Sequence, residues 1–507
     1  MHSKQKVLES LEIGNGVAEL ERSILSSFFF ESITWKKLRK DKIDFILGPK
    51  GSGKSALYYY LLEHESELHS EGSLIVSSEN TSGGSVFSTL ADDVSFEEAD
   101  LIRIWKLYFL TLILDTCKKN GITSKVSERT EDLLKQEGIY EQGWSITQLF
   151  TNISNYIRSR LYFDAADGEL ELDPSTGVPK KIKAKLTFGS PTTNQQKLGI
   201  VSIDALLQSY NNLLLQNNRK VWILLDRLDA IFPNDRDKEK IALRSLVRVY
   251  AAARNLPAIR IKIFMRNDLW SSITKEDGFR EASHLAPVTA RLDWDKSTLG
   301  EMLLKRFLLS GEFRTYFRKD ESFIKSNSND KHNFLYSLFP DNMNLYGNKP
   351  QKSFDWLVMY TQDGLGVSAP RDLIELVNSA IEYEITRLEK GDTPYKQRNL
   401  IFNHQGLNFG GSVLSKTKME QTIFAEFPEC RRFIEAFIDS SGRNFDDDKL
   451  ASVWGVKQEE ARKMASYLCE IGVLKKSSTK SGATNYLIPV LYTNYLGINP
   501  SKRNKVG

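Results

Sequence analysis

The sequence predicts an α/β fold built around a parallel sheet, followed by a helical domain and a small C-terminal domain of helices and strands. Three observations support this prediction. A continuous apolar run occurs at residues 221–225, and such runs are typical of strands buried on both faces of a parallel sheet. Mostly apolar stretches at residues 44–47 and 259–265 are also predicted to be strands. Helical patterns separate them, as connections between parallel strands require. After residue 290 the pattern is mostly helical and has no further strand followed by a glycine loop.

The elements of the first domain follow in βαβ order. The strand at 44–47 leads into a glycine loop and a helix, and a second short strand covers residues 73–76. Helices are expected at 203–216 and 238–254, on either side of the strand at 221–225.

Residues 161–189 have a different character. Apolar and charged side chains alternate there between turn residues, which predicts a β-rich insertion. Its lysines either form a solvated strand face or meet a partner.

The length of 507 residues suggests about three domains at roughly 150 residues each. We expect a sheet domain at 1–289, a helical lid domain at 290–401 and a C-terminal domain at 417–507. The glycine-containing stretch 402–416 between the last two is predicted to be a linker.

Composition excludes several classes of protein. With 41% hydrophobic and 26% charged residues the chain is neither collagen-like nor disordered. The net charge of +4 lies in residues 415–507, which hold 15 Lys and Arg against 11 Asp and Glu. Three dispersed cysteines argue against a disulfide framework or a cysteine zinc site, and the longest uncharged apolar run, 107–114, is too short to span a bilayer. We therefore expect a cytoplasmic protein with no membrane partner.

The glycine loop carries the strongest chemical signal. Residues 48–55 read G-P-K-G-S-G-K-S, which matches the phosphate-binding loop in full, with a strand before it and a helix after it. Backbone N–H groups of such a loop turn inward around phosphates, and the following helix N-terminus adds positive potential. The expected cofactors are ATP and Mg²⁺. Lys54 is expected to reach the β and γ phosphates, and Ser55 to bind Mg²⁺. The predicted contacts are Gly48, Pro49, Lys50, Gly51, Ser52, Gly53, Lys54, Ser55 and Ala56.

Two carboxylates at the end of the run 221–225 are candidates for catalysis. Asp226 has the position of the acid that holds hydrated Mg²⁺ beside a phosphate loop. Asp229 is a candidate to orient or deprotonate the attacking water. The alternative for Asp229 is a helix cap or a surface salt bridge.

Two arginines are candidates to sense the γ-phosphate. Arg266 ends the strand at 259–265, and its alternative role is an ion pair with Asp268. Arg371 opens a helix of the lid domain and is a candidate to reach back over the phosphates.

These motifs resemble the AAA+ and STAND branch of P-loop NTPases. The resemblance rests on the glycine loop and on four further segments: G-N-G-V-A-E-L-E at 14–21, L-L-D-R-L-D at 224–229, F-M-R-N-D at 264–268 and A-P-R-D at 369–372. It implies that Gly14 and Gly16 pack near adenine and that Asp226 handles magnesium. It also implies that Arg266 is a sensor 1 residue and Arg371 a sensor 2 residue.

In D-R-L-D the second acid follows the first at three residues. This spacing resembles that of STAND and KAP-type proteins more than the adjacent acids of most AAA+ machines, which implies a slow switch rather than a motor. More narrowly, the chain resembles bacterial P-loop ATPases that have a C-terminal winged helix and often occur beside mobile-element or antiphage genes. This likeness implies a role in antiviral defence. We also expect a homo-oligomer and a protein partner or effector.

The C-terminal domain is predicted to be a winged helix. A short helix and turn at 446–456, a longer helix at 458–471 and two strands around 475–484 support this. In a DNA or RNA interpretation, Lys475, Lys476 and Lys480 on the wing contact phosphates.

Two acids oppose that interpretation. Glu459 and Glu460 open the presumed recognition helix and would face phosphate repulsion. The alternative is a domain that packs on the ATPase or on a partner.

The sequence thus predicts a slowly hydrolysing, ATP-binding switch whose nucleotide state controls self-association or partner binding. Two alternatives stay open: an initiator-like ATPase acting on nucleic acid, and a scaffold that binds ATP without hydrolysing it. No metal other than Mg²⁺ is expected.

Overall fold

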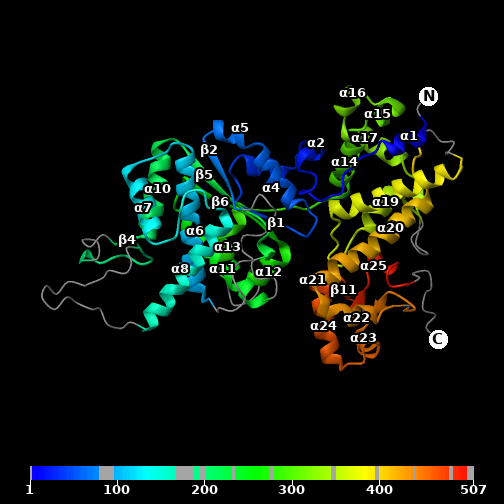
Figure 1. Ribbon diagram of the computed structural model, residues 1–507. Coiled ribbons are helices and arrows are strands. Elements are labelled where there is room, and N and C mark those ends of the chain that lie inside the picture. Colours follow the sequence, from blue (N-terminus) through cyan, green and yellow to red (C-terminus); the bar gives the residue numbers. More distant parts are fainter. Residues whose placement is uncertain are drawn as a thin grey trace. The chain divides into compact units, whose positions relative to one another are not determined.

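The chain forms two compact units in the computed structural model (Figure 1). The structure describes residues 3–78, 96–166, 186–194, 200–230, 235–274, 279, 281–343, 350–393, 399–438, 440–478 and 484–498. The sheet unit comprises Ser32–Gly48 and Leu57–Arg291. The helical unit comprises Met1–Glu31, Pro49–Ala56 and Leu292–Gly507.

A five-stranded parallel sheet forms the centre of the sheet unit. Its strand order is β2-β5-β6-β1-β7, and every neighbouring pair is parallel. The strands are β1 (Phe45–Gly48), β2 (Ser73–Ser77), β5 (Lys220–Leu225), β6 (Ile259–Arg266) and β7 (Thr289–Arg291). This sheet confirms the predicted α/β class and the four predicted strands.

The strand order places a topological reversal beside β1. The connection after β1 leads across the sheet to the edge strand β2, whereas the connection after β6 leads past β1 in the opposite direction to β7. In open parallel sheets, ligands bind outside the carboxyl ends of the strands at such a reversal. Gly48, which starts the glycine loop, is the last residue of β1.

Long helices enclose the core of the sheet unit. Helix α6 (Glu98–Lys119) packs against α8 (Ile146–Ala166), α10 (Ile203–Gln216) and α11 (Arg236–Ala253). Trp105 of α6 is buried and donates Nε1–H to the carbonyl of Ala242 in α11 at 3.2 Å. The remaining elements are α3 (Ile33–Arg39), α4 (Lys54–Glu63), α5 (Glu65–Ser70), α7 (Lys125–Gln136), η3 (Leu228–Ala230), α12 (Asn267–Thr274), α13 (Glu281–Leu285) and η4 (Ala286–Val288).

The predicted β-rich insertion at 161–189 is wrong at its start. Residues 161–166 complete helix α8, which begins at Ile146. At the other end, β3 (Leu186–Thr187) pairs in parallel with β4 (Val201–Ser202). Residues 167–185 lie outside the described part of the chain.

The helical unit has one hydrophobic core that the predicted lid and C-terminal domains share. Leu373 and Ile374 in α19 and Leu491 and Tyr492 in α25 belong to it. The elements before residue 427 are α1 (Lys4–Glu9), η1 (Arg22–Ile24), α2 (Leu25–Phe28), α14 (Lys296–Phe307), α15 (Gly311–Phe317), α16 (Glu321–Ile324), α17 (Ser328–Ser337), β8 (Asn342–Met343), β9 (Gln351–Lys352), α18 (Ser353–Tyr360), α19 (Pro370–Glu389), α20 (His404–Thr417), η5 (Lys418–Ile423) and α21 (Phe424–Glu426).

The predicted linker at 402–416 is instead helix α20, which packs along α19 (Figure 1). Its glycines allow close helix packing rather than flexibility. A Cβ at Gly410 would overlap the carbonyl oxygen of Leu376 in α19, and one at Gly411 would lie 2.7 Å from the Tyr360 ring. The local pattern suggested a linker because glycine is common in turns, whereas the neighbouring helix determines its role here.

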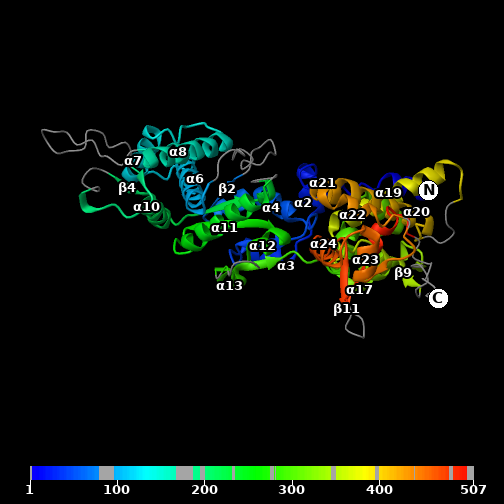
Figure 2. The same ribbon diagram turned by 90° about the horizontal axis from the view of Figure 1, so that it is seen from below.

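The C-terminal part contains the predicted helices and strands. Its elements are η6 (Pro428–Cys430), α22 (Arg431–Glu435), β10 (Asn444–Phe445), α23 (Asp447–Trp454), α24 (Gln458–Glu470), β11 (Lys475–Ser478), β12 (Thr484–Leu487) and α25 (Val490–Thr493). The three strands form an antiparallel sheet in the order β10-β12-β11, and β11 projects from this part in Figure 2. The winged-helix assignment stays a prediction.

Across the described ranges, the chain has no helix with the length and apolar character needed to cross a membrane. Cys117, Cys430 and Cys469 are free thiols.

Candidate nucleotide site

The glycine loop has the geometry that its sequence predicts. It follows β1 directly, and α4 begins at Lys54. Gly51 and Gly53 adopt φ angles of 77° and 92°, in the left-handed region that glycine reaches without steric cost. The backbone N–H of Ser52 donates to the Pro49 carbonyl at 3.3 Å, which closes a turn.

Two side chains of this loop are suited to phosphate. Lys54 turns back so that Nζ donates to the Pro49 carbonyl at 2.8 Å, which holds the ammonium group against the loop. Ser52 is only 1% exposed, and its hydroxyl oxygen has no hydrogen-bond partner among the described residues. A buried hydroxyl without a partner costs about 1–3 kcal/mol, so an acceptor such as a phosphate oxygen is favoured there. These residues fit a bound phosphate group.

The N-terminal segment that holds Gly14 and Gly16 is fixed by a buried carboxylate. Glu21 accepts the backbone N–H groups of Asn15 and Gly16 at 2.6 and 2.7 Å. Glu21 is 3% exposed and forms a 3.4 Å ion pair with Arg306 of α14. Arg306 also donates to the carbonyl of Ile13. Glu21 ends the segment 14–21 on which the resemblance rests, but its pairing with Arg306 was not predicted, because 285 positions separate the two residues.

Arg371 lies between the N-terminal segment and the glycine loop. Its Nε donates to the Gly16 carbonyl at 3.1 Å, and a Cβ built on Gly51 would lie 3.2 Å from the Arg371 Cβ. Asn378, two turns later on α19, donates Nδ2–H to the Gly14 carbonyl at 2.6 Å. The helical unit therefore brings together the predicted residues Gly14, Gly16, Gly51 and Arg371. It adds Asn378, which the sequence analysis did not name; its only sequence signal was a spacing that places it on the same helix face as Arg371.

A second group of predicted residues lies at the carboxyl ends of the strands in the sheet unit. Gly48 is the register partner of Arg266 across β1 and β6. Asp226 follows β5 directly and is 3% exposed. Arg266 donates to both carboxylate oxygens of Asp268, at 3.0 and 2.8 Å, and lies 3.5 Å from Asp229. The ion pair with Asp268, the alternative role for Arg266, is present, and the sensor role of Arg266 stays a prediction.

The turn that carries D-R-L-D is strained at its second residue. Arg227 has φ of 54°, a left-handed conformation that is uncommon for a non-glycine residue and is enriched at functional sites. Asp229 follows in η3 with a side chain that is 42% exposed. The N-terminal cap of the next helix is Asp235, so the capping alternative for Asp229 is wrong.

Glu239 joins this group, although the sequence did not single it out. It lies in the first turn of α11. Burial, together with the negative charges of Asp229 and Asp268, raises the pKa of Glu239 to about 8. A carboxyl with this pKa is mostly protonated at neutral pH and is a hydrogen-bond donor beside two carboxylates.

The candidate nucleic-acid contacts lie on an exposed strand. Lys475 and Lys476 belong to β11, whose four residues are all exposed. Lys480 lies outside the described residues. Glu459 and Glu460 are exposed in the first turn of α24, as the sequence predicted.

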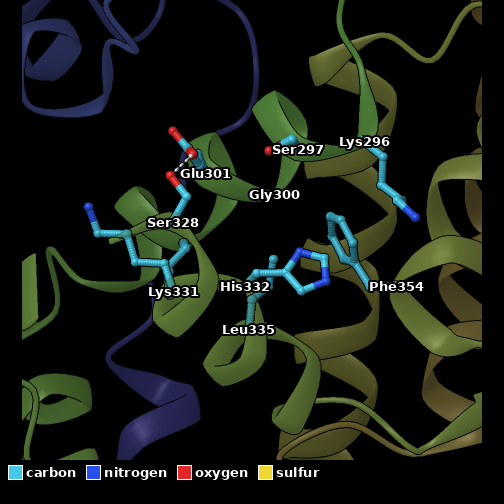
Figure 3. Close-up of a pocket in the computed structure, with 10 residues that line it drawn as sticks. Lys296, Ser297, Gly300, Glu301, Ser328, Lys331, His332, Leu335 and Phe354 are labelled. Carbon is cyan, nitrogen blue, oxygen red and sulfur yellow. Dashed lines mark hydrogen bonds between the residues drawn. The ribbon is translucent and has the colours of Figure 1, made fainter. Parts of the chain in front are cut away.

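A small cavity elsewhere in the helical unit contains none of the predicted residues. It has a volume of about 20 Å³, lies between α14, α17 and α18, and includes Lys296, His332 and Phe354 in its lining (Figure 3). Ser328 donates to Glu301 at its rim at 3.2 Å. This volume is close to that of one water molecule, so the cavity is too small for a nucleotide.

No family model matches the chain. Over 320 residues it is 23% identical to a protein of Escherichia coli strain K12 named "Putative transposon gamma-delta 80.3 kDa protein". The match covers 62% of this chain and 41% of that protein, so the chain spans about two fifths of the relative's length.

The solved structures with a partly similar chain trace include a Walker-type ATPase, an ORC2 protein and a Cdc6p. A Walker-type ATPase of Pyrococcus abyssi has a TM-score of 0.39 at 11% identity, covering 92% of this chain and 95% of its own. The ORC2 protein of Aeropyrum pernix has a TM-score of 0.41 at 11% identity, with 92% and 94% covered. Cdc6p of Pyrobaculum aerophilum has a TM-score of 0.27 at 10% identity, with 94% of both chains covered. These likenesses identify no family for this chain.

Proposed function

We propose that the protein binds ATP with Mg²⁺, hydrolyses it slowly, and uses its nucleotide state to control self-association or the binding of a protein partner. The single observation that carries this proposal is the glycine loop, with Lys54 folded against it and the Ser52 hydroxyl buried without a described partner.

Phosphate binding is assigned to the loop and to the first turn of α4. The backbone N–H groups of the loop surround the phosphates, and Lys54 exchanges the Pro49 carbonyl for phosphate oxygens. Ser55 and Asp226 are the residues that would hold Mg²⁺, which supplies charge neutralisation at the phosphates when bound.

Hydrolysis is assigned to the group at the carboxyl ends of the strands. Asp229 is the candidate to position water, and Arg266 the candidate to stabilise the γ-phosphate. Arg266 is already engaged by Asp268 and lies close to Asp229. Because this arrangement must reorganise before Arg266 can face a phosphate, it supports slow turnover.

Switching is assigned to Arg371. The N-terminal segment and the glycine loop both contact it, through Gly16 and Gly51. A ligand that draws the guanidinium toward a phosphate therefore changes the contacts of both segments and of α19, which carries Arg371.

Phosphate release and particle size, each measured with and without ATP, test this proposal. Wild-type protein is expected to release phosphate slowly and to change size with ATP. Lys54→Ala is expected to abolish both responses, because it removes the ammonium group that reaches the phosphates. Arg431→Ala, an exposed arginine paired with Glu435, serves as the control.

Undiminished ATP affinity in Lys54→Ala would contradict the proposal. Stoichiometric bound ATP without phosphate release would favour the scaffold alternative.

A second candidate function is nucleic-acid binding through β11. The exposure of all four residues of this strand, including Lys475 and Lys476, favours it. Duplex affinity is expected to fall linearly with salt on logarithmic axes and to weaken in Lys475→Ala and Lys476→Ala. No binding at low salt would reject it. The role in antiviral defence rests on the sequence resemblance and stays a prediction.

A further inference from the structure

Lys50, inside the glycine loop, forms an ion pair with Glu426 of α21, and both residues belong to the helical unit. The side chain of Lys50 is 40% exposed, whereas that of Glu426 is 19% exposed. The loop that is proposed to receive phosphates is thus already engaged, in this structure, by a carboxylate from a distant part of the chain.

Glu426 ends a helical stretch that runs without a break from His404. The stretch consists of α20, the π-helical segment η5 and α21. π-Helical segments are rare and frequently occur at functional sites.

The same stretch also contacts the helix that carries Arg371. Lys418, the first residue of η5, donates to both carboxylate oxygens of Asp372, at 3.0 and 2.7 Å. Asp372 is only 4% exposed and lies next to Arg371 in the first turn of α19. One helical stretch is therefore tied to the glycine loop at Glu426 and to the start of α19 at Lys418.

A nucleoside triphosphate changes the charge balance at Lys50. Its phosphates bring several negative charges to the loop, compete with Glu426 for the Lys50 ammonium group and repel the Glu426 carboxylate. Because Glu426 is mostly buried, solvent ions screen this repulsion less than they screen a fully exposed pair.

We infer that Glu426 is an internal competitor of the nucleotide phosphates for Lys50. Without nucleotide, Glu426 holds Lys50 and keeps α21 against the loop; a bound triphosphate takes over Lys50 and releases α21. Since α21 leads into η6 and α22, this exchange reports the state of the phosphate site to the C-terminal part of the chain. The inference rests on the proposed binding of ATP.

ATP affinity of the full-length chain tests the competition. Glu426→Gln keeps the shape of the side chain but removes its charge, and is expected to bind ATP about two- to fivefold more tightly than wild type, the range for a partly exposed ion pair. In a Lys50→Ala background the same substitution is expected to change affinity less than twofold, because the competition is already gone. Glu435→Gln removes a carboxylate from the next helix, where it pairs with Arg431, and is the matched control.

Hydrogen exchange of the backbone at residues 424–427 gives a second readout. ATP is expected to raise exchange there in wild type. Glu426→Gln is expected to show raised exchange before ATP is added, while thermal unfolding verifies that the variant is folded.

Equal ATP affinities for wild type and Glu426→Gln, with both proteins binding ATP, would overturn the competition and leave the proposed function intact. Absence of ATP binding in wild type and in every variant would overturn the proposed function itself, so the two failures are distinguishable.

Discussion

Gly16 and Arg371 are in direct contact although 355 positions separate them in the chain. The Arg371 Nε donates to the Gly16 carbonyl at 3.1 Å, and a Cβ built on Gly16 would lie 3.0 Å from the Arg371 Cα. The contact joins two residues that the sequence assigned to different functions, one near adenine and one near the phosphates. It makes the N-terminal segment part of the proposed nucleotide site.

Gly16→Ala is expected to weaken ATP binding and to lower the free energy of unfolding. Gly16 has φ of 71°, and a left-handed conformation costs an alanine about 1–2 kcal/mol. The added methyl group also crowds Arg371. Calorimetric ATP titration and thermal unfolding measure the two effects. Gly311→Ala is the control, because a Cβ there meets no atom within 4 Å. Equal behaviour of both variants would contradict the role of the contact.

Two substitutions of Arg227 are expected to show how much the strained backbone conformation costs, because both remove the arginine side chain but differ in their tolerance of a positive φ. Arg227→Val puts a β-branched residue at a φ of 54° and is expected to destabilise the protein by about 1–3 kcal/mol. Arg227→Asn is expected to cost less, because asparagine tolerates this conformation. Urea unfolding of both variants checks the order. A valine variant as stable as the asparagine variant would show that the turn relaxes without cost.

The raised pKa of Glu239 predicts a pH dependence of stability. Burial keeps this carboxyl protonated in the folded protein up to about pH 8, whereas it ionises near its ordinary pKa when unfolded. The folded state therefore binds more protons between these values, and stability falls as pH rises through that window.

Glu239→Gln is expected to flatten this slope, as urea unfolding at pH 5, 7 and 9 would show. Asp237→Asn, an exposed carboxylate in the same turn, is the comparison and is expected to follow the wild-type slope. An unchanged slope in Glu239→Gln would contradict the protonated state of Glu239 in the folded protein.

Gly410→Ala is expected to destabilise the helical unit. The new methyl group would overlap the Leu376 carbonyl oxygen, so α20 and α19 must separate, and overpacking of this kind costs about 1–3 kcal/mol. Thermal unfolding measures the loss, with Gly311→Ala again as the control. A variant that gains stability, as expected for alanine in an exposed helix, would contradict the close packing of the two helices.

Much of the sheet unit was predictable because its signals are local. An apolar run indicates a buried strand whichever strands it pairs with. The glycines of the loop allow the positive φ angles that the loop requires. The strands at 45–48, 73–77, 220–225 and 259–266 and the loop at 49–53 therefore agree with prediction. The helix at 404–417 was missed because its glycines face residues of α18 and α19, outside any local window.

The contacts of the candidate site depended on the tertiary structure. Residue types, spacing and the resemblance to known ATPases named Gly16, Lys50, Arg266 and Arg371. They gave no sign that Arg306 contacts the segment of Gly16 or that Glu239 lies near Arg266. Strand order pairs Gly48 with Arg266, and the packing of the helical unit pairs Lys50 with Glu426. Local backbone preference and burial pattern are encoded over a few neighbouring residues. The partner of each charged side chain is determined only when elements hundreds of residues apart pack together. Ion pairs depend on the distance between two groups in space and not on their separation in the sequence.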